Sequence, residues 1–258
     1  MIQIDFANRV KKILEDDENV IGLAAGGSWI DNAMDEFSDL DLVIVTHKKI
    51  APDKEHMIEF ARRLGDYISG FTGDHVGEPR LLICLYSDPL LHVDLKFVTL
   101  DEFHHRVENP VILLDKGEKL KAILDNSKPQ FPFPDYQWIE DRFWTWIHYA
   151  LLKIGRGEYF EALDFLAFLR GTVLGPLLHI KSKNLPRGVR KVETDLQQKD
   201  LDVLKGTIAA YDKQSLISAL QNSIQLYRNL REELFDNTIV VNTRAEQEVM
   251  KYFAQLTN

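Results

Sequence analysis

The sequence predicts an α+β fold in two parts: an N-terminal domain with a small mixed sheet and flanking helices, and a C-terminal helical bundle. Three observations support this prediction. In residues 1–127, short apolar runs alternate with segments of helical periodicity. Three prolines then fall between Pro129 and Pro134, which is typical of a linker. Every periodic segment in residues 135–258 has helical spacing, so we expect two domains, 1–127 and 135–258.

The first domain is predicted to contain four strands and three helices. Apolar spacing near 3.6 predicts an amphipathic helix over residues 3–17. The segments NVIGLAAGGS and DLDLVIVT are strand candidates, and the second has a β-branched interior run. Residues 52–69 have helical spacing, with Pro52 near the first turn. RLLICLYS and LLHVDLKFV are two more strand candidates, separated by an Asp-Pro turn, and residues 117–125 form a short helix.

The second domain is predicted to be helical throughout. Residues 136–155 have apolar side chains at helical spacing, and residues 157–180 are apolar almost all round, so we expect that second helix to be buried. Further helices are predicted over 197–210, 213–236 and 243–256.

Composition places the chain among soluble globular proteins. Of its 258 residues, 45% are hydrophobic and 28% are charged, which excludes a disordered chain. We expect no membrane helix, because no apolar run approaches the ~18–20 residues that one needs, and the N-terminus lacks a signal-peptide core. The single cysteine, Cys84, excludes a disulfide framework and a cysteine-based zinc cage. We expect a cytoplasmic protein without membrane association.

The acidic residues are concentrated in the first half of the chain. Residues 1–125 contain 24 acidic and 14 basic residues, whereas residues 126–258 contain 16 and 17. An acidic surface disfavours non-specific binding to nucleic acid and favours metal cations and cationic small molecules. It is also the ordinary state of many soluble proteins.

The most informative segment is GGSWIDNAMDEFSDLDLVIV. Gly26, Gly27 and Ser28 end one predicted strand, and Asp39 and Asp41 begin the next. Residues i and i+2 of a strand face the same side, so the two carboxylates should lie side by side, where hard oxygen ligands suit Mg²⁺. Glycines permit close approach of a phosphate, and Ser28 adds a hydroxyl donor. The alternative is that Asp39 and Asp41 are only surface charges at a turn.

A third carboxylate, Asp94, lies in the centre of an apolar strand, where an unpaired charge is costly. Metal ligation would offset that cost, and so would a salt bridge with a lysine or arginine. Lys96 follows at i+2 on the same face and could bind phosphate oxygens, or could be an exposed lysine at a strand edge.

This pattern resembles the nucleotidyltransferase superfamily that includes DNA polymerase beta and the antibiotic adenylyltransferases. The shared features are Gly27-Ser28, a ten-residue spacer, Asp39-Leu40-Asp41 and a third acid on a later strand, within residues 20–98. The helical half more loosely resembles the C-terminal domains of aminoglycoside and lincosamide nucleotidyltransferases. The resemblance implies transfer of a nucleoside monophosphate from a nucleoside triphosphate to a hydroxyl of a small-molecule acceptor, antibiotics among them, with release of pyrophosphate.

The same resemblance implies roles for individual residues. Asp39, Asp41 and Asp94 would be catalytic and would hold two Mg²⁺ ions, which clamp the attacking and leaving oxygens of an in-line displacement. The residues expected to bind the nucleotide are Gly26, Gly27, Ser28 and Lys96.

Glu161 and Asp164 are the catalytic candidates of the helical half. They are three residues apart on the nearly all-apolar helix, so they share a face. We expect one of them to face the cleft between the two domains, opposite the three aspartates, as a general base or as a ligand of a cationic acceptor. The alternative is a structural ion pair with one of three arginines, Arg142, Arg156 or Arg170.

Two other functions stay open at this point. The chain could transfer AMP to a protein target, as toxin–antitoxin-type nucleotidyltransferases do, or it could bind nucleotides without turnover. The basic run Lys181–Lys191 reads as a solvated loop or, alternatively, as a clamp for the triphosphate or the acceptor.

Overall fold

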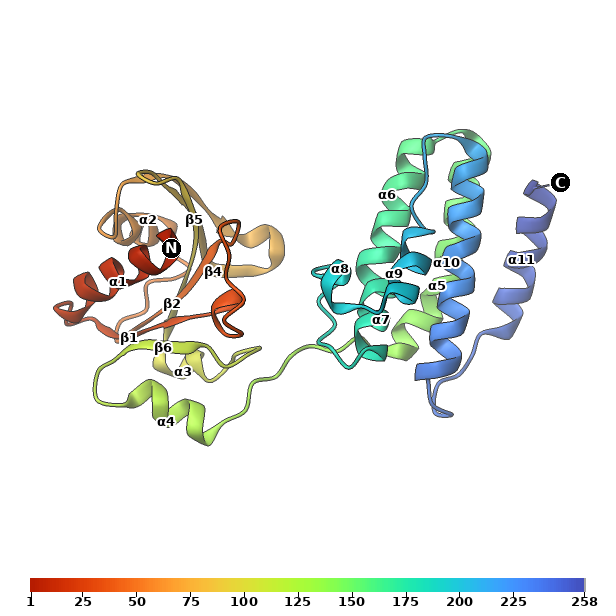
Figure 1. Cartoon of the computed structure of the whole chain (residues 1–258). Helices are drawn as coiled ribbons and strands as arrows, with labels where there is room; N and C mark the ends of the chain where they lie inside the picture. The colour runs from red at the N-terminus through yellow and green to blue at the C-terminus, as the bar shows by residue number, and fades with distance from the viewer. Residues whose placement is uncertain (258) are drawn as a thin grey trace. The chain divides into compact units, whose positions relative to one another are not determined.

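The structure, a computed structural model, describes residues 1–257. The chain divides into two compact units, one up to Phe131 and one from Pro132 onward (Figure 1). The division falls inside the proline-rich segment that the sequence predicts as a linker. The first unit contains a six-stranded mixed sheet with helices, and the second is helical, so the predicted fold class is confirmed.

The first unit alternates helices and strands along the chain. Its elements are α1 (Ile2–Glu15), β1 (Val20–Ala25), a 3₁₀ turn η1 (Gly27–Trp29), β2 (Leu40–Thr46), α2 (Lys54–Arg62), β3 (Tyr67–Gly73), a 3₁₀ turn η2 (Asp74–Val76), β4 (Glu78–Tyr86), β5 (Leu91–Thr99), α3 (Leu100–Phe103), β6 (Val111–Asp115) and α4 (Lys119–Asn126).

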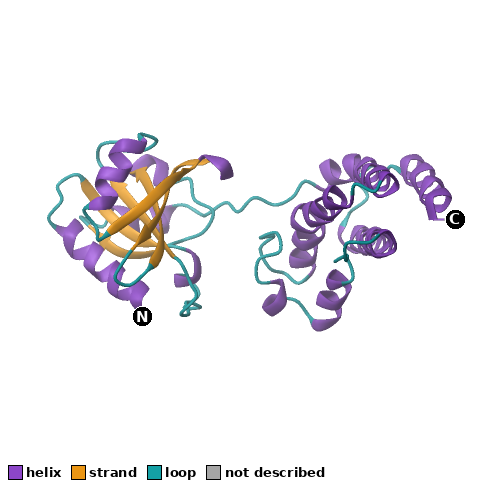
Figure 2. Cartoon of the chain, turned by 90° about the horizontal axis from the view of Figure 1, so that it is seen from above, coloured by secondary structure: helices purple, strands orange, loops and turns teal. Residues whose placement is uncertain are grey.

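The strand order of the sheet is β3-β4-β5-β2-β1-β6, and only β2 and β5 are parallel neighbours. Figure 2 shows the strands in orange with helices on both sides. On one face, α1 and α2 bury side chains such as Phe6 and Met57 against Leu42 and Leu95 of the central strands. On the other face, a smaller core around Phe103 joins α3 and α4 to the sheet. The remaining part of this second face presents polar side chains of β2 and β5, such as Asp41 and Asp94, beside apolar side chains of β4 such as Ile83.

The sequence prediction differs from the structure at both edges of the sheet. The helix predicted over 52–69 ends at Arg62, and the chain then enters the edge strand β3. Asp53 caps α2 by accepting hydrogen bonds from two backbone N–H groups, which places Pro52 before the helix rather than in its first turn. The other edge strand, β6, is absent from the prediction, and so is α3, which a capping box at Thr99 begins.

The second unit consists of helices of unequal length. They are α5 (Tyr136–Arg156), α6 (Tyr159–Leu169), a π-helical segment η3 (Arg170–Leu174), α7 (Gly175–Lys181), α8 (Val192–Asp195), α9 (Gln198–Lys205), α10 (Lys213–Leu234) and α11 (Thr243–Thr257). The helix predicted over 157–180 is thus one helical run whose middle turn is a π-helix.

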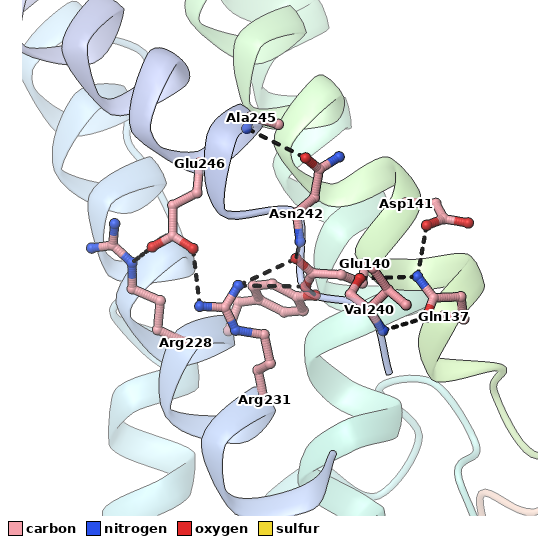
Figure 3. A network of polar contacts seen from close by, with 10 residues as sticks. Gln137, Glu140, Asp141, Arg228, Arg231, Val240, Asn242, Ala245 and Glu246 are labelled. Atoms are coloured by element: carbon pink, nitrogen blue, oxygen red, sulfur yellow. Dashed lines mark hydrogen bonds and ion pairs between the residues drawn. The ribbon is translucent and has the colours of Figure 1, made fainter. Parts of the chain in front are cut away.

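A polar network lies inside this helical unit and joins α5, α10 and α11 (Figure 3). Its centre is Glu140, whose side chain is fully buried. The carboxylate accepts hydrogen bonds from the Tyr227 hydroxyl and the Asn242 backbone N–H, and it pairs with the Arg231 guanidinium at 3.3 Å. Arg231 also pairs with Glu246 of α11 at 2.9 Å. The buried charge is therefore paired and hydrogen-bonded, as burial of a carboxylate requires.

The helical run Tyr159–Lys181 is long and apolar enough to span a membrane by length and composition alone. Half of its most apolar window is buried inside the helical unit, and one such helix is weak evidence for a membrane span. Its inner face packs against α5 and α10, with buried residues such as Leu166 and Leu177. Cytoplasmic location stays a prediction.

Candidate active site

A glycine turn at the end of β1 lies directly against the start of β2. The Gly26 N–H donates to the Asp41 carbonyl over 3.0 Å. Gly27 has a positive φ of 57°, and a Cβ atom placed on it would lie 2.0 Å from the Asp41 carboxylate oxygen Oδ2. Any side chain at position 27 would therefore displace that carboxylate. Ser28 follows in the 3₁₀ helix η1, which is a single turn.

The pairing of β2 with β5 brings the predicted carboxylates together. These strands are parallel, and Asp41 is the direct partner of Asp94. The neighbours of Asp41 within β2, Leu40 and Leu42, are buried in the core on the opposite face, so both carboxylates lie on the polar face. Asp39 immediately precedes β2, and all three aspartates are half-buried. The pairing of β2 with β5 thus places Asp41 and Asp94 side by side, whereas Asp39, predicted on the same strand as Asp41, precedes that strand.

His92 is a neighbour of this group that the sequence reasoning missed. Its ring nitrogen Nε2 lies 2.9 Å from Asp94 Oδ1, and half of its side chain is exposed. The signal was present in the sequence, because His92 precedes Asp94 by two residues and so lies on the same strand face. The hydrogen bond fixes one carboxylate oxygen of Asp94 and leaves an imidazole at the rim of the site.

Lys96 also lies on this face of β5, but it is already ion-paired. Its Nζ lies 2.8 Å from Glu78 Oε2, and Arg80 binds the same carboxylate through two nitrogens at 2.7 Å each. The hydrogen bond from Arg80, assisted by Lys96, lowers the pKa of Glu78 to about 2. Glu78 therefore stays ionised at neutral pH and pairs with both cations, so a phosphate could bind Lys96 only by competing with Glu78.

The donor chemistry of the aspartates fits a hard cation such as Mg²⁺, because carboxylate oxygens are its preferred protein ligands. In residues 1–257, however, no three His, Cys, Asp or Glu side chains are arranged closely enough to hold a metal ion as they stand. The backbone places Asp41 and Asp94 as strand partners, so rotation of side chains, rather than movement of strands, would be needed to gather their oxygens.

Glu161 and Asp164 lie on α6 of the other unit, and both side chains are exposed. The expectation that they are buried in an apolar helix is wrong, since only one face of α6 packs into the core. Glu161 accepts a hydrogen bond from the Tyr149 hydroxyl and pairs with Lys153 at 2.9 Å. The hydrogen bond of Lys153 with Glu158, and then that with Glu161, raises the pKa of Lys153. The three arginines considered as partners bind elsewhere. Arg142 donates to the Trp138 carbonyl, Arg156 pairs with Glu158, and Arg170 donates to the Thr207 carbonyl. A role for either acid in catalysis stays a prediction.

No protein-family model matches this chain, and no curated protein matches it in sequence. Solved structures do match it. One is an aminoglycoside 6-adenyltransferase from Bacillus subtilis, with 17% identity, a TM-score of 0.41, and coverage of 99% of this chain and 97% of that one. A nucleotidyltransferase-like protein from Exiguobacterium sibiricum has 13% identity, a TM-score of 0.36, and coverage of 89% and 75%. A spectinomycin adenyltransferase from Enterococcus, solved with ATP and spectinomycin, has 14% identity, a TM-score of 0.30, and coverage of 100% and 99%.

The similarity to these three solved structures is weak. Their TM-scores are below 0.5 and their identities below 20%, so they assign no substrate and no residue role to this chain. The function has to be argued from the residues of the site itself.

Proposed function

We propose that this protein is a Mg²⁺-dependent nucleotidyltransferase that transfers a nucleoside monophosphate from a nucleoside triphosphate to a hydroxyl of a small-molecule acceptor. The observation that carries the proposal is the contact of Gly27 with Asp41, next to the pairing of Asp41 with Asp94. Gly27 has no room for a Cβ, Asp41 and Asp94 are strand partners, and Asp39 precedes Asp41 by two residues. Together they would form an anionic site beside a turn of backbone N–H groups. Such a site suits a polyphosphate that carries its own cations.

Each part of the site has a distinct task in this proposal. The first N–H groups of a helical turn have no partner inside it, so the turn at Gly27 and Ser28 can bind the leaving phosphates. Asp39, Asp41 and Asp94 would hold two Mg²⁺ ions, whose chemistry is to stabilise charge on the attacking and leaving oxygens. The acceptor oxygen attacks the α-phosphorus, the new P–O bond forms, and the bond to pyrophosphate breaks.

The helical unit supplies the acceptor-binding part of the proposal. Glu161 and Asp164 present exposed carboxylates on α6, and Glu161 bonds the Tyr149 hydroxyl. Lys153 pairs with Glu161 at 2.9 Å and lies 5.0 Å from the centre of the Tyr149 ring, so an acceptor amine would replace it there. Carboxylates next to an aromatic ring suit an acceptor that bears an amine. We propose that one of these acids binds the acceptor or takes the proton from its hydroxyl.

The test uses ATP labelled at the α-phosphate, Mg²⁺, and a panel of aminoglycosides, lincosamides and a cell extract. Label on a small molecule supports the proposal, label on a protein identifies a protein acceptor, and no transfer at all leaves a nucleotide-binding protein. A parallel reaction with ATP labelled at the γ-phosphate distinguishes nucleotidyl transfer from phosphoryl transfer, because only phosphoryl transfer moves that label to the acceptor.

The acids of α6 are tested with Glu161→Gln and Asp164→Asn. If one acts only in the transition state, its variant loses kcat and keeps nucleotide affinity. If both variants keep full kcat, neither Glu161 nor Asp164 takes part in the reaction.

A further inference from the structure

A buried glutamine of α1 connects the body of the first unit to the loop that leads into Asp39. Gln3 is 1% exposed and lies on the apolar face of α1 with Phe6, Ala7 and Val10. Its side-chain Nε2 donates to the Asp35 carbonyl over 3.0 Å and to the Ser38 carbonyl over 2.7 Å. Both hydrogens of one amide are thus used on a loop more than thirty residues away in the sequence.

The loop between Asp35 and Ser38 is closed on itself. Ser38 Oγ donates to Asp35 Oδ1 and accepts from the Asp35 N–H, and the Phe37 N–H also donates to Asp35 Oδ1. Phe37 is 86% exposed, so the apolar side chain of this turn does not anchor it in the core. The two hydrogen bonds from Gln3 therefore hold a compact turn whose next residue is Asp39.

The orientation of the Gln3 amide follows from its partners. Two carbonyl oxygens can only accept, so the NH₂ group must face the loop. Among the described residues, the remaining amide oxygen Oε1 is buried without a hydrogen-bond partner. An unpaired buried acceptor destabilises a fold, and an apolar residue of the same shape would avoid that cost. Gln3 is thus poorly suited to stability alone and well suited to holding the loop.

We infer that Gln3 is a positioning residue for the active site: its amide fixes the turn at residues 35–38 and thereby sets the place of Asp39. The inference rests on the proposed function for its consequence in nucleotide binding, but the tether itself is tested without it.

The first experiment compares Gln3→Met with the wild type by hydrogen exchange of the nucleotide-free protein. Methionine keeps the length and removes both donors. We expect amide exchange at residues 35–39 to rise by about tenfold or more, as for the loss of one to two net hydrogen bonds, while the thermal midpoint is unchanged or higher. Val10→Ala is the matched control, because it removes core volume from the same helix face two turns away and should lower the thermal midpoint without selective exchange in the loop. Unchanged exchange at 35–39 in Gln3→Met would overturn the inference.

The second experiment measures the thermal shift produced by Mg·ATP in a double-mutant cycle of Gln3→Met and Asp39→Asn. If Gln3 acts through Asp39, Gln3→Met reduces the shift in the wild-type background and has no further effect in the Asp39→Asn background. An equal reduction in both backgrounds would show that Gln3 does not act through Asp39. If the wild type shows no Mg·ATP shift, the proposed function fails, and the exchange experiment still decides whether Gln3 positions the loop.

Discussion

At the scale of single residues, the candidate site requires glycine at position 27, because glycine has no Cβ atom. The positive φ of this glycine and its contact with Asp41 Oδ2 have different consequences for a substitution. The positive φ strains the backbone of any other residue placed at position 27. The closeness to Asp41 means that a side chain there would move a carboxylate that the proposed function needs.

Gly27→Ala separates these effects when it is compared with Gly77→Ala. Gly77 also has a positive φ, 75°, but a Cβ there would meet no atom within 4 Å. We expect Gly77→Ala to destabilise the protein by about 1–2 kcal/mol and to keep activity. Gly27→Ala should cost more and should abolish the Mg·ATP thermal shift. Urea unfolding and thermal shift measure both, and a Gly27→Ala variant with full nucleotide binding would contradict the role given to this turn.

Some residues of the candidate site could be predicted from the sequence, and others could not. Gly27, Asp41 and Asp94 were predictable because strand periodicity and a short spacer determine their faces. Strand periodicity also places His92 on the same face as Asp94. The sequence analysis did not select it, because an exposed histidine is common on protein surfaces. Gln3 was not predictable, since its partners are two backbone carbonyls more than thirty residues away, and no spacing in the sequence encodes them.

At the scale of elements, the start of β4 is fastened to β5 by Glu78, which binds Arg80 and Lys96. Arg80 is the main cause of the lowered pKa of Glu78, about 2 against 4.5 in a model peptide. A folded-state pKa below the unfolded value stabilises the protein above pH ~4.5, and this stabilisation is lost as the pH falls from there toward 2.

Glu78→Gln should therefore lower the free energy of unfolding by about 1–3 kcal/mol at pH 6, and the difference from the wild type should shrink between pH 4.5 and the acid limit of folding. Urea unfolding at a series of pH values measures it. Glu59→Gln, an exposed position of α2, is the control and should show no such trend. A difference independent of pH would mean that Glu78 contributes by packing rather than by charge.

In the helical unit, the Glu140 network predicts a large effect from one buried carboxylate (Figure 3). Glu140→Ala leaves the Arg231 guanidinium without its buried partner, so we expect a loss of about 3–5 kcal/mol. Glu248→Ala removes an exposed ion pair with Lys251 on α11, and exposed pairs contribute little, so this variant should unfold almost as the wild type does. Similar values for the two variants, measured by urea unfolding, would contradict the structural role of the network.

The elements themselves were predicted unevenly. The central strands and the long helices were predictable because their apolar periodicity is driven by burial. The edge strands were not, for a related physical reason: β3 contains two glycines and alternates poorly, and β6 is only five residues long and is paired on one side. The stability of both comes from pairing with a neighbouring strand, which leaves little trace in local sequence.

At the scale of the whole molecule, the two units have separate cores, and the proposal gives them separate tasks. A fragment of residues 1–131 should fold and bind Mg·ATP, because it contains the glycine turn and the three aspartates. It should not transfer the nucleotide to an acceptor, because Glu161 and Asp164 are absent. Circular dichroism, thermal shift and the labelled-ATP assay test these points in turn. Transfer by the fragment at the rate of the full chain would remove the helical unit from the reaction.

The most direct test of the central claim is a calorimetric titration of ATP into the full-length protein, with and without Mg²⁺. The account predicts binding that requires Mg²⁺, that is lost in Asp41→Asn, and that is retained in Asp16→Asn, an exposed position at the end of α1. The Asp41→Asn variant should still unfold at a similar temperature, because removal of one charge relieves repulsion with Asp94. ATP binding that is equally tight without Mg²⁺, or that survives in Asp41→Asn, would contradict a carboxylate-based nucleotidyltransferase site.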